Sequence, residues 1–236
     1  ARGGLGWSPA PVSRVRGRRW LVQRVAAWLE QEPGLALRAA LYDLADSLAQ
    51  VFEEMRGEGV SFDDIRQIDV SQHSDHWARA LKFLTIVDQV EEDGEAPDAA
   101  ARLRMAAEHL AKDWAVSPPC GPVILAGSTG SRGATNVLMR AVARLPQGAV
   151  VGPGYDVDLP DHVWTQSRND PLTGEDHPQY RFRKLAQSLD LGPRDVFPWT
   201  ASEQNDARNR LVSLALRPAP VTDQWLAEGP ALQDLD

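Results

Sequence analysis

Cysteine, lysine and long apolar stretches are all scarce in this sequence of 236 residues. The one cysteine, Cys120, excludes an internal disulfide and a cysteine-rich metal site, and it fits a reducing, cytoplasmic setting. No apolar run approaches the roughly 20 residues of a membrane-spanning helix, and no signal peptide is visible, so we expect no membrane partner. The chain begins at Ala1 and not at Met, which we interpret as a fragment or a processed chain.

The net charge of −8 is unevenly distributed along the chain. Residues 1–29 carry six arginines and no acidic residue, residues 30–116 have a net charge of −11, and residues 117–236 have −3. The acidic middle is a poor candidate for gripping a phosphate backbone. The Arg-rich start is a better one, although short basic ends are often only solvated tails. We expect residues 1–17 to lack regular structure.

Apolar residues at helical spacing predict four helices between residues 18 and 117. The residues that we expect to face inward are Leu21, Val25, Trp28 and Leu29 in the first helix, Leu37, Leu41, Leu44, Leu48, Val51 and Met55 in the second, Trp77, Leu81, Leu84 and Val87 in the third, and Leu103, Ala107, Leu110 and Trp114 in the fourth. Gly57 and Gly59 end the second helix, and Ser61 with Asp64 resembles a capping box. The tryptophans at these spacings are interpreted as packing residues.

A strand–loop–helix–strand unit follows Pro122. Val123–Ala126 is a short apolar run without alternation, which predicts a strand buried on both faces of a parallel sheet. The helix that follows carries Leu138, Ala141, Val142 and Leu145 on one face, and Ala149–Val151 begins a second, parallel strand. The sequence therefore predicts an α/β protein with a helical first half and a small parallel βαβ sheet.

The loop Ser128–Gly133 lies at the carboxyl end of the first strand, where open α/β sheets bind their ligands. Small residues there let the backbone approach an anion, and the next helix offers N–H groups. The candidate phosphate or nucleic-acid ligands are Ser128, Thr129, Ser131 and Arg132. A plain strand-to-helix turn remains the alternative. The loop has no Walker A lysine and lacks the glycine spacing of a dinucleotide fingerprint.

Acidic and histidine side chains give weaker signals. Asp156 and Asp158 follow the second strand and could bind Mg²⁺ or act as acid and base, while Asp161 could cap a short helix carrying Val163 and Trp164. His73, Asp75 and His76 form at most half a metal site. His177 could be a base, but no nucleophile motif accompanies it. We therefore predict no metal, no cofactor and no catalytic residue in this chain.

Two further helices are predicted near the carboxyl end. His177–Tyr180 opens one with Phe182, Leu185 and Leu189 inward, which Gly192-Pro193 stops. Thr200 with Glu203 resembles a second capping box, opening a helix through Leu211 and Leu214. The predicted organisation is a disordered segment 1–17, a helical subdomain 18–117, an α/β segment 118–200, and a carboxyl-terminal helix with an acidic tail, 201–236.

The segment from Ala126 to Val151 resembles the alphaproteobacterial type of double-strand break repair protein AddB. Members of that family carry Ala-Gly-Ser-Thr-Gly-Ser-Ile-Pro-Ala-Thr, a helix, and then Leu-Pro-Gln-Gly-Ala-Val-Val. Here Arg132 and Gly133 stand in place of the Ile-Pro pair, and Gly152 and Tyr155 replace the two leucines of the family's Leu-Pro-Gly-Leu-Asp end. The resemblance continues at residues 177–180, 183–185, 216–219 and 222–225.

The resemblance implies a piece of the helicase-like region of one subunit of a helicase–nuclease that processes double-strand breaks for recombination. Such a piece would form a helical insertion and part of a RecA-like core, shape a DNA path and dock an AddA-type partner subunit. No stretch resembles the family's nuclease motif or its iron–sulphur cysteines, so we expect neither ATPase nor nuclease activity from this chain alone. The alternative is an independent α/β enzyme or binding protein for a phosphorylated small molecule.

Overall fold

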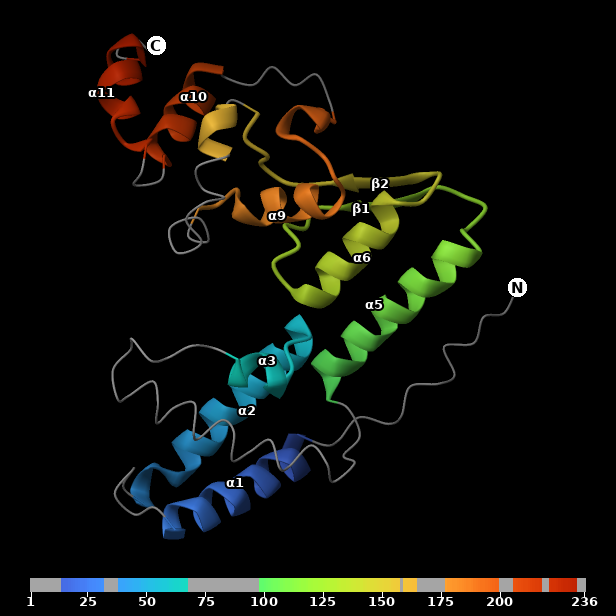
Figure 1. Cartoon of the computed structure of the whole chain (residues 1–236), viewed down its shortest axis with the longest axis vertical. Helices are drawn as coiled ribbons and strands as arrows, with labels where there is room; N and C mark the ends of the chain where they lie inside the picture. The colour runs from blue at the N-terminus through green and yellow to red at the C-terminus, as the bar shows by residue number, and fades with distance from the viewer. Residues whose placement is uncertain are drawn as a thin grey trace. The chain divides into compact units, whose positions relative to one another are not determined.

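The computed structural model describes residues 14–31, 38–67, 98–157, 159–164, 177–199, 206–217 and 221–232. In these residues the chain is mostly helical, with one two-stranded parallel sheet (Figure 1), which agrees with the coarse α/β layout predicted from the sequence. Two compact units are present: Ala1–Leu110 with Arg132–Val137, and Ala111–Ser131 with Leu138–Asp236. No helix among the described residues is long and apolar enough to cross a membrane.

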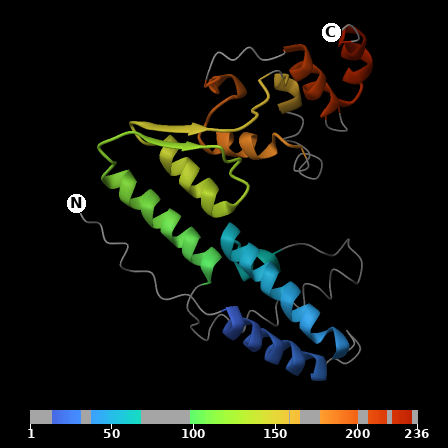
Figure 2. The same cartoon turned by 180° about the vertical axis from the view of Figure 1, so that it is seen from behind.

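The first unit is built on two packed helices, α1 (Arg14–Gln31) and α2 (Leu41–Glu58), with the short η1 (Arg38–Ala40) directly before α2. They lie side by side in both views (Figures 1 and 2). The residues predicted to face inward from the first helix are all buried, namely Leu21, Val25, Trp28 and Leu29. Because α1 begins at Arg14, the prediction that residues 1–17 lack regular structure is wrong for 14–17, and residues 1–13 lie outside the described part.

The buried face of α2 is rotated from the predicted one. Of the predicted inward residues, Leu48 and Met55 are buried, Leu41, Leu44 and Val51 are only partly buried, and Leu37 lies outside the described residues. The other buried residues of α2 are Ala45 and Phe52. The rotation brings Phe52 against Phe62 of α3 (Phe62–Arg66), with ring centroids 5.5 Å apart in an edge-on arrangement. Burying the aromatic ring of Phe52 stabilises the fold more than deeper burial of the partly buried leucines would, because an aromatic side chain removes more apolar area from water.

The end of α2 and the start of α3 follow the predicted chemistry. Gly59 caps α2 in the left-handed region at φ 69°, which favours glycine. Ser61 and Asp64 form the predicted capping box, with both reciprocal hydrogen bonds present. The predicted third helix at residues 77–87 lies outside the described residues.

The helix α5 (Ala99–Val116) confirms the predicted fourth helix but not its whole inward face. Ala107 is buried, whereas Leu103 is 55% exposed, so its prediction as a core residue is wrong. The start of α5 is fixed by Asp98, whose carboxylate accepts the N–H of Ala101 at 2.8 Å and pairs with Arg56 at 2.8 Å. The position of α5 near its start therefore depends on polar contacts, which the apolar pattern does not record.

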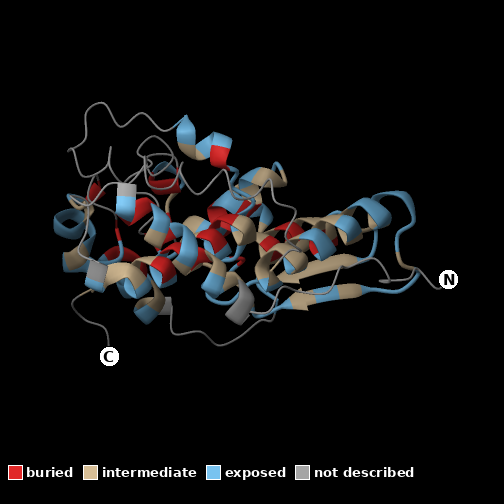
Figure 3. Cartoon of the chain, turned by 90° about the horizontal axis from the view of Figure 1, so that it is seen from below, coloured by how far each residue is buried: buried red, intermediate tan, exposed pale blue. Residues whose placement is uncertain are grey.

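The predicted parallel strands are present as β1 (Val123–Ala126) and β2 (Gly148–Val151), paired from Val123 with Gly148 to Ala126 with Val151. The prediction that the first strand is buried on both faces is wrong, since burial along β1 alternates and Ile124 is 55% exposed. In Figure 3 both strands are drawn as intermediate or exposed, while buried positions lie along the helices. The described residues thus cover the sheet incompletely.

The strands are connected through α6 (Gly133–Ala143). Of the predicted inward face, Val142 is buried, and Leu138, Ala141 and Leu145 are only partly buried. The buried residues of α6 are Ala134, Val137, Met139 and Val142. A helix that buries residues on more than one side has no single apolar stripe. The spacing of its apolar residues therefore predicts that a helix forms but not which of its faces are buried.

The rest of the second unit is helical, comprising α9 (Tyr180–Ser188), η3 (Pro193–Asp195), α10 (Asp206–Ala215), α11 (Gln224–Glu228) and η5 (Gly229–Leu232). A small core contains Leu159, Val163, Trp164 and Val221. Phe182 and Leu185 are buried as predicted, and Leu189 is partly buried. In α10, Leu214 is buried and Leu211 is 47% exposed. The predicted capping box at Thr200 and Glu203 lies outside the described residues.

Candidate functional site

The predicted ligand loop leaves the carboxyl end of β1 and enters α6. Its backbone is set by Gly127 and Gly130, with φ of 79° and 66°, in the left-handed region that side chains disfavour. The N–H of Gly127 donates to the carbonyl of Val151 at 2.9 Å and extends the strand pairing into the loop. Gly130 is buried. The loop is therefore a fixed turn built on the sheet.

All four predicted ligand residues lie in this turn, but they are not equally available. The hydroxyl oxygen of Ser128 accepts the N–H of Gly130 at 3.2 Å, so this side chain serves the turn itself. Thr129, Ser131 and Arg132 are exposed. The carbonyl of Arg132 accepts the N–H of Asn136 at 2.9 Å in the first turn of α6. The guanidinium of Arg132 is thus carried at the start of a helix and faces solvent.

Glu58 shapes this site, although no pattern in the sequence points to it. The N–H of Gly133, at the start of α6, donates to the carboxylate of Glu58 at 2.8 Å. A side chain at Gly133 would meet the carbonyl of Gly57 at 2.7 Å and the Cα of Glu58 at 2.8 Å. The chain's own carboxylate therefore occupies the place at which an anionic ligand would meet the first N–H of the helix.

Among the described residues, the acidic candidates after β2 do not form a metal site. Asp161 pairs with Arg194 at 2.9 Å, and Asp158 lies outside the described residues, as do His73, Asp75 and His76. Over the described ranges, no group of three or more histidine, cysteine, aspartate or glutamate side chains is arranged to hold a metal ion. Asp156 instead donates its backbone N–H to the side chain of Gln179 at 3.1 Å.

His177 is a buried residue at the junction of several segments. Burial lowers the pKa of its imidazole, and the charges of Arg183 and Arg217 lower it further, against the opposing effects of the Leu216 backbone and Asp156. Its Nδ1 accepts the N–H of Gln179 at 3.1 Å. The imidazole is therefore held neutral at pH 7, as a buried structural acceptor.

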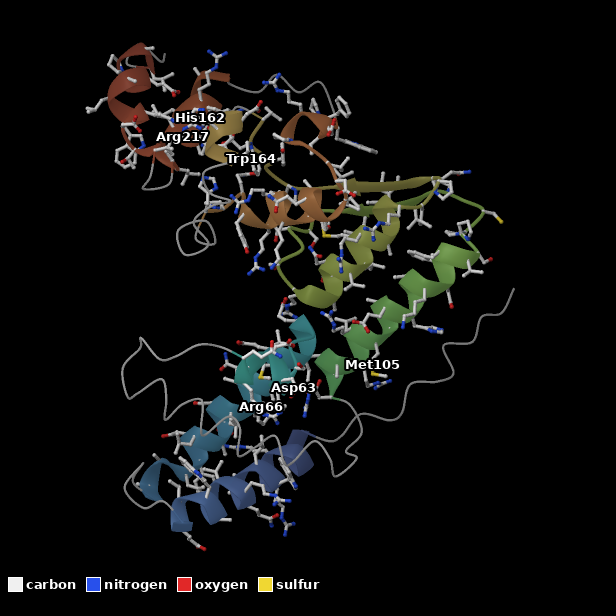
Figure 4. All side chains as sticks on the ribbon, viewed as in Figure 1. Asp63, Arg66, Met105, His162, Trp164 and Arg217 are labelled. Carbon is white, nitrogen blue, oxygen red and sulfur yellow. The ribbon has the colours of Figure 1, made fainter. Side chains whose placement is uncertain are left out.

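Two of the segments that carry the family resemblance near the carboxyl end, residues 177–180 with 183–185 and residues 216–217, meet around this histidine. The first segment, residues 177–180, leads into α9, and residues 183–185 lie within that helix. The second, residues 216–217, directly follows α10. The indole N–H of Trp225 donates to the carbonyl of Leu214 at 2.8 Å, which attaches α11 to α10. Trp164 and Arg217 are labelled in Figure 4. Motifs far apart in the sequence thus fold into one packed cluster.

A hollow of about 420 Å³ opens in the second unit. Its walls come from the turn after β2, the short helix at residues 161–164, α9 and η3, and none of them belongs to the loop Ser128–Arg132. The lining residues are Tyr155, Asp161, Trp164, Arg183, Ala186, Gln187, Leu191, Gly192, Pro193, Arg194 and Asp195. The structure thus presents two separate candidate sites, the exposed loop and this hollow.

Comparison with known proteins finds no matching family model, no matching curated protein and no matching solved structure. The function of the chain therefore has to be inferred from its residues and from their arrangement in the structure.

Proposed function

We propose that this chain is part of the inactivated helicase-like region of an AddB-type helicase–exonuclease subunit. In that role it acts in the cytoplasm in DNA double-strand break repair and recombination. It shapes part of a DNA path and docks an AddA-type partner subunit. The proposal starts from the resemblance of residues 126–151, 177–185 and 216–225 to that family.

The observation that carries the proposal is the arrangement of the resembling segments. The first of them forms a parallel strand pair whose loop stands at the carboxyl end of β1, as a ligand-facing loop of an α/β core does. The others form the cluster around His177. Motifs that pack together in this way are features of one fold, and this supports a common architecture with the family.

Exposed apolar side chains support the docking role. In the second unit Ile124 is 55% exposed, Trp199 66%, Phe197 81% and Leu226 85%. Parallel strands are normally covered on both faces, whereas Ile124 on β1 is more than half exposed. A protein surface that covers β1 is therefore expected in the complete assembly, and Phe197, Trp199 and Leu226 are further apolar side chains open to a partner.

The exposed loop supports the role in a DNA path. Arg132 supplies a permanent charge, and Thr129 and Ser131 supply hydroxyl donors, which together suit a phosphate group. With no lysine after the loop glycines, the loop lacks the Walker A group that reaches the β- and γ-phosphates of ATP. The loop accordingly suits a backbone phosphate of DNA better than a nucleotide that is turned over.

The test of this role is binding of single-stranded DNA, measured by fluorescence anisotropy of a labelled oligonucleotide over a series of salt concentrations. We expect Arg132→Ala to leave the fold intact, because its side chain is exposed, and to weaken binding modestly. The slope of log affinity against log salt should fall by about one, as for the loss of one phosphate contact. The exposed Arg144→Ala is the charge-matched control. An unchanged slope would remove Arg132 from the DNA path.

The docking role is tested separately by mixing the chain with a purified AddA-type subunit and measuring complex formation by size-exclusion chromatography. A complex that Leu226→Asp disrupts supports docking through the exposed apolar surface. Two proteins that elute separately at micromolar concentrations would contradict this part of the proposal.

A further inference from the structure

The hollow between α9, η3 and the turn after β2 has one aromatic wall. The rings of Tyr155 and Trp164 are stacked, with centroids 5.6 Å apart and planes 20° apart, and Phe182 meets Tyr155 edge-on at 6.0 Å. The hydroxyl of Tyr155 donates to the carbonyl of Pro193 at 3.1 Å, and burial raises the pKa of this phenol to about 12. Trp164 is only 8% exposed, so Tyr155, which is partly buried, is the ring of this wall that a ligand in the hollow would contact, and its phenol does not ionise near neutral pH.

The rim of the hollow carries an accessible cation. The side chain of Arg194 is 85% exposed, and its Nη2 bonds Asp161 at 2.9 Å. A guanidinium has five N–H donors, so this contact leaves most of them for a second anion. The other carboxylate at the rim, Asp195, already accepts the N–H of Gly192 at 2.7 Å. The guanidinium of Arg183 lies deeper in the wall and adds positive charge.

An apolar aromatic wall next to an exposed guanidinium matches a flat ring that carries a phosphate. Base stacking on aromatic side chains is favourable for every base, and arginine binds phosphate through charge-assisted hydrogen bonds. The volume of about 420 Å³ is in the range of small-molecule sites. We propose that this hollow holds one nucleotide of single-stranded DNA, with its base against the Tyr155–Trp164 wall and its phosphate on Arg194. This inference rests on the proposed function and adds to it a second DNA contact.

The experiment uses a single-stranded oligonucleotide of thymidines with one 2-aminopurine, whose fluorescence falls when it stacks on an aromatic ring. Binding is followed in parallel by anisotropy of a labelled copy. The first variant, Gln187→Trp, fills the hollow from an exposed position of α9. Its matched control is Gln147→Trp, another exposed glutamine of the second unit, which lies outside the hollow. Circular dichroism checks that each variant is folded.

We expect 2-aminopurine to be quenched on binding to the unmodified chain and to the Gln147→Trp variant. In Gln187→Trp the affinity should fall about tenfold, as for the loss of one base stack. Arg194→Ala should lower the salt slope by about one, whereas Arg181→Ala, an exposed arginine of α9 outside the hollow, should lower affinity less.

The outcomes separate the two proposals. DNA binding without quenching by the unmodified chain, or an affinity that Gln187→Trp leaves unchanged, would overturn the nucleotide site in the hollow while leaving the DNA path in place. A chain that binds no single-stranded DNA at low salt would overturn the DNA path, and the hollow with it.

Discussion

Gly133 shows how one residue adapts the loop to its surroundings. Members of the family that the chain resembles have Pro at this position, and proline lacks a backbone N–H and suits the first residue of a helix. Glycine brings an N–H to the same place, and Glu58 accepts its hydrogen bond. Glu58 and Gly133 therefore act as a pair that connects the start of α6 to α2, and a proline at position 133 could not form this hydrogen bond.

We predict that Gly133→Ala destabilises the chain by about 1–3 kcal/mol, because its methyl group would overlap the backbone of Gly57 and Glu58. Chemical denaturation followed by circular dichroism measures the effect. The matched control is Gly121→Ala, since nothing lies within 4 Å of a side chain at Gly121. Equal stability of the two variants would mean that the space beside Gly133 is open.

His177 gives a prediction about pH. Burial lowers the pKa of its imidazole below the usual 6.5, so the unfolded chain binds a proton more readily than the folded one. The stabilisation is fully present above pH 6.5 and is lost as the pH falls through 6.5 toward the lower folded-state value. The melting temperature should therefore drop between pH 7.5 and pH 5.5.

The His177→Asn variant isolates this effect, because its amide oxygen can still accept the N–H of Gln179 while the group no longer titrates. We expect a smaller drop in melting temperature over the same pH range. His109→Asn, at an exposed position of α5, is the control. A drop of the same size in all three proteins would assign the pH dependence to other groups.

At the scale of elements, apolar spacing predicted the helices better than their faces. In α1 all four predicted core residues are buried, because one partner helix covers one stripe. In α2 the face turns toward Phe62, and in β1 burial alternates although the sequence does not. Contacts made by residues distant in sequence decide these faces, and local periodicity holds no information about them.

The corrected face of α2 gives a prediction for two neighbouring leucines. Leu48 is 2% exposed, whereas Leu44 is only partly buried. Leu48→Asp places an unpaired carboxylate in the core at a cost of several kcal/mol, against a typical stability of about 5–15 kcal/mol, and should unfold the first unit. Leu44→Asp should cost less, and the exposed Ser47→Asp should be close to neutral. Thermal melting ranks the three. A Leu44→Asp variant that melts below Leu48→Asp would mean that α2 buries Leu44 more deeply than Leu48.

The site was predicted in the same partial way. Strand, loop and helix were found at the right residues because glycine spacing and apolar runs are local signals. The role of Glu58 was missed, since it lies 75 positions from Gly133 and belongs to another element. The hollow was missed because its lining comes from four segments whose meeting depends on the fold.

At the scale of the molecule, the chain alone is predicted to have no ATPase activity, since its loop lacks the lysine that a phosphate-binding loop of ATPases uses. Phosphate release from ATP, measured with and without single-stranded DNA, checks this. A known DNA-dependent ATPase serves as the positive control. Turnover that persists after repeated purification, in proportion to the amount of chain, would contradict the proposed function.

The packing of Gly133 beside Gly57 has a consequence for synthesis. The first unit includes Arg132–Val137 in addition to Ala1–Leu110, so it is discontinuous along the chain. A ribosome that has released residue 110 has not yet delivered the backbone N–H that Glu58 binds. Until residues 132–137 emerge, the carboxylate of Glu58 lacks this partner, and the first unit is completed only after β1 has been made.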